Sequence, residues 1–330
     1  MRSTRCRPPA IGNGTPHRVP RATPATRTPW PSWSAWTGPR TARSPGTATL
    51  AEAIKLVARA HQTLIWDRHR HLLRLRGALR EFFPAALDAF DDLTAPDALE
   101  LLGAAPDPVT AASLSHARIR GALHRARRRN PAGRAVQVQA ALRAEQLGQP
   151  PVVTGAYAAI VRSLTAVITA LNTQIKAMEV QVVTHFGRHP DAERYRSQPG
   201  LGDVLAARVL AEFGDDPTRY AAARSRKNYA GTSPITKASG KKKVVLARYA
   251  RNDRLADALH QQAFCALTAS PGARAYYDTL RARGIGHHAA LRQLANRLVG
   301  ILHGCLKTGT RYNEDTAWAH HSHQAQRAAA

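Results

Sequence analysis

The sequence predicts a mainly α-helical protein, in which a helical or coiled-coil middle region precedes a compact helical C-terminal domain. Apolar residues recur at helical spacing over two long stretches, and the C-terminal half contains several helix-capping residues. Only a short basic segment ending in Val244, Val245 and Leu246 is β-prone. We therefore expect a basic segment over 1–49, a helical region over 50–190, a C-terminal domain over 191–318 and a tail over 319–330.

The chain is strongly basic, and its 330 residues are enough for two domains. Its 48 Lys and Arg residues against 22 Asp and Glu residues give a net charge of +26. This balance is typical of proteins that bind polyanions, so nucleic acid is the expected partner. We see no run of about 18 apolar residues and no signal-peptide pattern, and therefore expect a cytoplasmic protein with no membrane partner.

The first 49 residues contain nine prolines and eight arginines but no acidic residue, and show neither helical nor strand periodicity. We expect this segment to be disordered. From Leu50 to Phe82 apolar residues at helical spacing predict a long amphipathic helix that ends near Pro84. Shorter helices follow, broken by prolines, and then a cluster of arginines that faces either solvent or phosphate: Arg125, Arg127, Arg128 and Arg129.

A second long helix is predicted over about 151–186, where apolar residues from Val153 to Val182 form a seam. Such a seam suits a coiled coil, and one buried helix of a bundle fits equally well. Either structure needs a partner helix. Residues 50–83 can supply it within the chain or across a dimer, so we expect a homo-oligomer.

The C-terminal half is predicted to be a series of capped helices. Asp216, Asn252 and Ser270 each precede a helical first turn, and Gly284 is a plausible C-terminal stop. The expected helices cover 203–213, 217–228, 253–269, 271–283 and 287–306.

A glycine-containing turn, Pro199-Gly-Leu-Gly202, leads directly into the first of these helices. Gly200 and Gly202 free the backbone to present amide groups at a helix N-terminus, which favours an anion. The turn resembles the hairpin of helix-hairpin-helix modules, which hold a nucleic-acid phosphate. A plain turn between helices is the alternative.

The basic segment from Lys237 to Lys243 places Ser239 beside a glycine and next to Lys241, Lys242 and Lys243. A hydroxyl among cations can act as a nucleophile toward phosphate, but by spacing alone a basic loop that grips phosphate is the stronger interpretation. Further contacts to phosphate are expected from Arg248, Arg251 and Arg254.

The residues predict no metal site in this chain. The three cysteines are far apart and lack CxxC spacing, so neither a zinc ribbon nor a disulfide framework is indicated. Paired acidic residues lie at loops and caps, without the trio that a two-metal nuclease needs. We expect no cofactor in the chain itself.

The stretch from Pro199 to about Trp318 resembles the C-terminal domain of the IS110/IS116/IS902 family of insertion-sequence transposases. Residues 50–186 resemble the family's middle region, which includes a dimerising coiled coil. The C-terminal match lies in the Pro-Gly-Leu-Gly turn, 227–234, Ala238-Ser-Gly240, Ala250-Arg-Asn252, Arg254-Leu255, 277–284 and 291–298.

The resemblance implies DNA transposition by strand exchange, with the serine of the Ser-Gly pair, Ser239, as nucleophile. Ser233 is a neighbouring alternative. Family members also carry four acidic residues on a RuvC-like domain that bind Mg²⁺, and some are guided by a structured RNA that bridges target and donor DNA. This chain is therefore expected to bind DNA, and a guide RNA is a further expected partner.

The N-terminus departs from the family, because the acidic cluster is absent from it. If residues 22–37 are written in GC-rich codons and read one base out of phase, they give a stretch that resembles the family's Asp-Ala-Gly-Asp motif. We therefore interpret residues 1–49 as an out-of-frame remnant of the RuvC-like domain. The expected function is a transposase that binds DNA but does not recombine by itself; the alternative is a non-enzymatic helical DNA- or RNA-binding protein.

Overall fold

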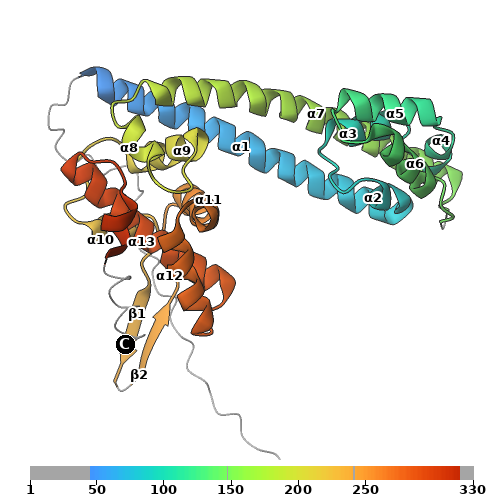
Figure 1. The fold of residues 1–330 in the computed structure, drawn as a ribbon. Helices are drawn as coiled ribbons and strands as arrows, with labels where there is room; N and C mark the ends of the chain where they lie inside the picture. The colour runs from blue at the N-terminus through green and yellow to red at the C-terminus, as the bar shows by residue number, and fades with distance from the viewer. Residues whose placement is uncertain (1–44, 147, 241, 320–330) are drawn as a thin grey trace, which may run out of the picture. The chain divides into compact units, whose positions relative to one another are not determined.

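Two long helices, α1 (Pro45–Phe82) and α7 (Pro151–Gly187), run antiparallel and pack side by side (Figure 1). At one end Ile54 shares an apolar cluster with Val182, and at the other the Phe82 ring stacks on Tyr157 with centroids 4.9 Å apart. The prediction of two long helices is confirmed, and the partner helix comes from the same chain. Coiled-coil packing and dimerisation stay predictions.

The computed structural model describes residues 45–146, 148–240 and 242–319. Most of the segment that we expected to be disordered, together with the stretch at 22–37 that we interpret as out of frame, lies outside these ranges, as does the tail after Ala319. Helix α1 begins at Pro45, earlier than the boundary predicted at Leu50. The apolar pattern could not reveal this, because the first turn contains only Pro, Gly, Thr and Ala.

A group of short helices packs against the far ends of α1 and α7, around a second apolar core. Prolines open three of them, in agreement with the preference of proline for the first helical turn. Side chains of Asp107, Ser115 and Asn130 cap helix N-termini. The helices are α2 (Ala85–Ala89), α3 (Pro96–Ala104), α4 (Pro108–Ala112), α5 (His116–Arg125) and α6 (Pro131–Leu142).

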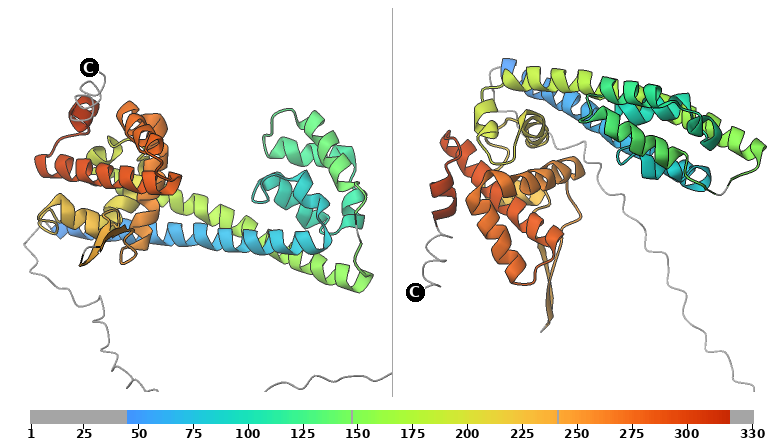
Figure 2. Two further views of the ribbon diagram at one scale, coloured as in Figure 1. Left: turned by 90° about the horizontal axis from the view of Figure 1, so that it is seen from below. Right: turned by 45° about the vertical axis from the view of Figure 1, so that its right-hand side comes forward.

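The helices of the C-terminal domain, orange to red in Figure 2, gather beside one end of the long helix pair. Within the domain α9 packs against α8 and α11, and its residues from Ala206 to Phe213 are all buried. This helix also contacts α1 and α7, so the domain packs directly on the helix pair. The elements are α8 (Ala192–Arg196), α9 (Asp203–Phe213), α10 (Ala223–Tyr229), β1 (Ile235–Ser239), β2 (Lys242–Leu246), α11 (Asp253–Ala269), α12 (Pro271–Ala282) and α13 (His287–Thr308). The mainly α fold class is confirmed.

Most of the predicted C-terminal helices lie where expected, and the predicted caps explain why. The Asn252 side chain accepts from Leu255 N at the start of α11, and that of Ser270 accepts from Ala273 N at the start of α12. Gly284, with φ of 78°, ends α12 as predicted.

The predicted helix 217–228 is wrong in its first half, since α10 begins at Ala223. Asp216 forms a local turn instead: its carboxylate accepts from the Thr218 amide at 2.8 Å and from the Thr218 hydroxyl at 2.7 Å. Aspartate side chains offer the backbone this alternative to a helix. Tyr220 is then free to enter the core beside Phe213.

Among the described residues one helix, α7, is long and apolar enough to cross a membrane, with a mean hydropathy of 1.5 over 18 residues. This qualifies the expectation that the chain has no long apolar stretch. Core helices of soluble proteins meet the same criterion, and α7 packs along α1. Exposed apolar side chains remain on it, among them Ile160, Val167 and Val180.

The turn at Gly200 approaches helix α11 closely. Gly200 has φ of 76°, and a Cβ there would lie 2.5 Å from the carbonyl oxygen of Gln262 and 2.7 Å from the amide nitrogen of Ala266. Gly202, by contrast, has φ of −74° and open space around it. Only the first glycine is therefore required by packing.

We expect Gly200→Ala to lower the free energy of unfolding by about 2 kcal/mol, because the left-handed conformation and the backbone clash both oppose a Cβ. Gly202→Ala should cost less than about 1 kcal/mol. Urea unfolding of the two variants, followed by circular dichroism, checks this difference. Equal losses would show that the turn does not pack on α11.

Candidate nucleic-acid interface

Strands β1 and β2 form an antiparallel hairpin that extends away from the helices (Figure 1). The register runs from Ile235 opposite Leu246 to Ser239 opposite Lys242. Gly240 follows with φ of 54°, which suits a tight hairpin turn. The β-prone segment is therefore confirmed as a strand, and the hairpin presents most of its residues to solvent.

Ser239 is the last residue of β1 and is exposed at the hairpin tip. Lys237 lies two residues earlier and hence on the same strand face. Lys242 and Lys243 follow the turn, where the backbone pairing places them opposite Ser239 and Ala238. Lys241 lies outside the described residues. The structure thus gathers the hydroxyl and the basic residues into one projecting element.

No histidine or carboxylate among the described residues forms a hydrogen bond with Ser239. A serine hydroxyl is a weak nucleophile without an adjacent base or metal ion. The hairpin alone provides cations and a hydroxyl, and these groups are suited to binding a phosphate oxygen. Nucleophilic attack would need activation by groups from elsewhere.

The three arginines that follow the hairpin are placed differently from one another. Arg248 donates to the carbonyl oxygen of Ser233 at 3.4 Å, and Arg251 donates to Asp253 at 3.2 Å, both at the base of the hairpin. These two remain partly accessible. They can accompany the hairpin in contacting phosphate.

Arg254 instead faces helix α1. Its guanidinium lies over the Trp66 ring, 4.7 Å from the centroid, and donates to Thr63 Oγ1 at 3.0 Å and to the carbonyl oxygen of Arg59 at 3.2 Å. This geometry favours a role in holding α11 against α1. The sequence could not reveal it, because Arg254 lies in the same basic run as Arg248 and Arg251.

The turn at Gly200 and Gly202 leads into the N-terminus of α9, as the anion-site prediction requires. Asp203 occupies the first turn of that helix and forms an ion pair with Arg196. A carboxylate there already benefits from the positive end of the helix dipole and competes with an incoming phosphate. Phosphate binding by Gly200 and Gly202 therefore stays a prediction.

A buried carboxylate, which sequence analysis missed, lies at the base of the hairpin. Glu212 of α9 accepts from Arg59 of α1 at 2.7 and 2.8 Å, and from Asn252 Nδ2 at 2.7 Å. Asn252 also bonds the Tyr229 hydroxyl at 2.9 Å and caps α11. Glu212 and Asn252 together thus connect α1, α9, α10 and α11 where the hairpin returns to the helices.

Opposing effects act on the pKa of Glu212. Burial raises the pKa, but hydrogen bonds from Arg59 and Asn252, together with the positive charges of Arg59 and Arg254, lower it below its ordinary value of 4.5. The carboxylate is therefore charged at neutral pH. The only sequence signal for this role was an acidic residue near the end of a mainly apolar helix, which also contains Asp203 and Arg208.

Within the described residues, no three His, Cys, Asp or Glu side chains gather in a way that would hold a metal ion. The residues present therefore do not fit a two-metal site.

A model of the Transposase IS116/IS110/IS902 family matches residues 192–278, a range that includes the hairpin. The chain is 42% identical to a mini-circle putative transposase for IS117 of Streptomyces coelicolor, over 83% of this chain and 68% of that protein. The chain belongs to the IS116/IS110/IS902 transposase family. An IS900 protein of Mycobacterium paratuberculosis is 29% identical over 82% of this chain and 67% of its own length. An IS116 protein of Streptomyces clavuligerus is 30% identical over 78% and 64% respectively.

We expect Glu212→Gln to lower the free energy of unfolding by about 2 kcal/mol at pH 7, because a buried, charge-assisted hydrogen-bond network is broken. Since the folded-state pKa lies below 4.5, the stabilisation is complete above that value and is lost as the pH falls through the folded-state pKa. The gap between wild type and variant should therefore narrow below about pH 4.5. Urea titrations at several pH values check this.

The matched control is Glu52→Gln, which removes an exposed carboxylate that pairs with Lys55 on the same helix α1. It should change stability by less than about 0.5 kcal/mol at any pH. A constant gap between wild type and Glu212→Gln down to pH 3 would contradict the assigned role of Glu212.

Proposed function

We propose that this chain binds DNA during transposition of an insertion sequence, with the β1–β2 hairpin against the DNA backbone. The observation that carries the proposal is the clustering of Ser239, Lys237, Lys242 and Lys243 on one exposed hairpin within the family-matched region. Lysine side chains suit phosphate contacts that are independent of base sequence. The net charge of +26 adds long-range attraction to the same partner.

Ser239 is the proposed nucleophile of strand exchange. Its oxygen would bond to phosphorus as one phosphodiester P–O bond breaks, and the departing strand would take up the serine proton as a free hydroxyl. Attack by another strand's hydroxyl would reverse these changes and release the serine. Neighbouring cations would stabilise the charge that develops on the phosphate oxygens.

In this proposal the 330-residue chain binds DNA but does not exchange strands, since the described residues supply neither a base nor metal ligands beside Ser239. The same observation favours the second candidate, a non-enzymatic DNA- or RNA-binding protein. A strand-transfer assay with Mg²⁺ on the chain joined to a RuvC-like domain of the family separates the two, because only the first candidate predicts strand exchange by that protein. Recombination by this chain alone would contradict both the second candidate and the proposed catalytic defect.

Two further parts of the proposal rest on the family resemblance: a structured guide RNA, and Mg²⁺ held by acidic residues beyond those described. The proposed homo-oligomer rests on the two long helices, and the proposed cytoplasmic location rests on the sequence pattern. The exposed apolar residues of α7 are consistent with self-association. Light scattering of the full chain tests the oligomer.

The positive charge of the hairpin should determine how strongly DNA binding depends on salt. Changing Lys241, Lys242 and Lys243 together to Ala should reduce the slope of log affinity against log salt by about 3, if each lysine meets one phosphate. Fluorescence anisotropy with a labelled DNA duplex measures the slope. The control replaces three exposed arginines of α1, which carry equal charge: Arg74, Arg76 and Arg80.

This control should change the slope much less than the hairpin substitutions do. An equal reduction of the slope in both variants would show that DNA binding depends on the total charge only, and would refute the assignment of the hairpin to the DNA interface.

Substitution of Ser239 separates a role as nucleophile from a role in binding phosphate. Ser239→Ala removes one hydroxyl and no charge, so DNA affinity should stay within about twofold, or about 0.4 kcal/mol. When the chain is joined to a RuvC-like domain of the family, the same substitution should abolish strand exchange. Ser233→Ala at the hairpin base is the control and should retain it. Exchange by the Ser239→Ala protein would refute the nucleophile assignment.

A further inference from the structure

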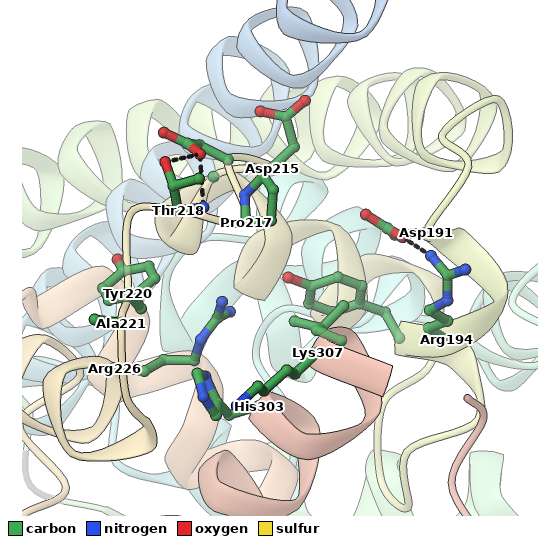
Figure 3. A pocket seen from close by; sticks show the side chains of 14 residues that line it. Asp191, Arg194, Asp215, Pro217, Thr218, Tyr220, Ala221, Arg226, His303 and Lys307 are labelled. Atoms are coloured by element: carbon green, nitrogen blue, oxygen red, sulfur yellow. Dashed lines mark hydrogen bonds and ion pairs between the residues drawn. The ribbon is translucent and has the colours of Figure 1, made fainter. Parts of the chain in front are cut away.

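A cavity of about 390 Å³ lies in the C-terminal domain, and none of its lining residues belongs to the hairpin (Figure 3). Its walls come from α8, the segment between α9 and α10, the buried face of α10, and α13. Pockets that bind small molecules have about 300–1,000 Å³. The volume is therefore sufficient for a ligand larger than a single phosphate.

Arg226 is an unusually buried cation in the wall of this cavity, with only 4% of its surface exposed. Its guanidinium carbon lies 4.7 Å from the Phe213 ring centroid and 4.6 Å from that of Tyr220. Within the described residues its Nε and Nη1 atoms have no hydrogen-bond partner. Aromatic faces compensate only part of the cost of burying a charge, so an anion bound at these atoms would stabilise the guanidinium.

Other basic groups lie on the same side of the cavity as Arg226. His303 and Lys307 of α13 both line it, and Figure 3 shows them beside Arg226. The pKa of His303 is lowered by burial and then by the positive charges of Arg226, Lys307 and Lys227. The potential on this side is therefore positive, which favours a phosphate.

Carboxylates line the opposite side, and each has its own contacts. Asp216 accepts from the amide and hydroxyl of Thr218, and Asp191 is paired with Arg194. Asp215 lies 3.9 Å from His189 Nε2. In Figure 3 Asp215 is separated from Arg226 by the breadth of the cavity. The ligand should thus be anionic at one end and carry N–H or O–H donors at the other.

We propose that this cavity binds a single unpaired nucleotide of a nucleic-acid strand, with its phosphate on Arg226 and its base or sugar donors toward Asp215 and Asp216. A nucleotide combines the two required ends, and a cavity of this volume holds one residue rather than a duplex. Proteins that extrude a base from a duplex also hold it in a pocket of this kind. The inference rests on the proposed nucleic-acid function and adds a second contact to it.

Thermal unfolding of the full chain with adenosine 5′-monophosphate tests the cavity, with adenosine and inorganic phosphate as comparison probes at equal ionic strength. The monophosphate should raise Tm saturably, because it binds only the folded state. Adenosine should raise it far less. Absence of a saturable effect would overturn the proposal, and inorganic phosphate as effective as the monophosphate would overturn the nucleotide assignment.

Arg226→Met removes the buried charge and should weaken monophosphate binding at least about tenfold. Arg224→Met removes an exposed charge from the same helix and should leave binding unchanged. Lys307→Met changes an exposed side chain at the cavity, so it gives a folded variant even if Arg226→Met does not fold. It should weaken binding severalfold. Wild-type binding by both Arg226→Met and Lys307→Met would refute the assignment.

The two proposals fail in different ways. If the cavity assignment is wrong, the monophosphate effect is lost while the hairpin lysines still set the salt dependence of duplex binding. If the hairpin function is wrong, duplex binding is insensitive to those lysines while Arg226→Met still abolishes the monophosphate effect.

Discussion

The buried carboxylate of Glu212 is the interaction on which the rest of the C-terminal domain depends. It accepts hydrogen bonds from Arg59 of α1 and from Asn252, the residue that caps α11 after the hairpin. A charge in this position is stable only if its partners stay in place, because an unpaired buried carboxylate costs several kcal/mol. The two ends of the network belong to segments that are far apart in sequence. The same contact therefore fixes the helix pair and the base of the hairpin relative to each other.

Local sequence signals predicted the ends of helices correctly where neighbouring residues alone determine those ends. The caps at Asn252 and Ser270 and the stop at Gly284 depend on neighbouring residues, and their helices begin or end as expected. The start of α10 was missed because the turn at Asp216 competes with a helix over the same residues. Roles set by tertiary contacts were not visible: Arg254 and Arg248 look alike in sequence, yet only Arg254 is bound to α1.

The same limit explains which parts of the candidate sites could be predicted. Ser239 and its lysines are consecutive in the chain, so a pattern of adjacent residues reveals them before any fold is known. The cavity around Arg226 combines residues from α8, α10 and α13, which only the packing brings together. In a chain with 48 Lys and Arg residues, nothing in the sequence distinguishes a buried arginine from an exposed one. Burial, and not residue type, makes Arg226 a candidate.

The hairpin and the cavity would bind phosphate through different kinds of interaction. Exposed lysines are flexible and hydrated, so they contribute attraction that salt screens and that depends little on geometry. Arg226 is already desolvated and held against two aromatic rings, so a phosphate there meets a fixed guanidinium and loses less binding energy to ordering the side chain. The first arrangement suits binding along a DNA backbone. The second arrangement suits selection of one nucleotide in a defined position. Helix α9 connects the hairpin and the cavity, since its Glu212 accepts a hydrogen bond from Asn252, after the hairpin, and its Phe213 ring contacts Arg226 in the cavity wall.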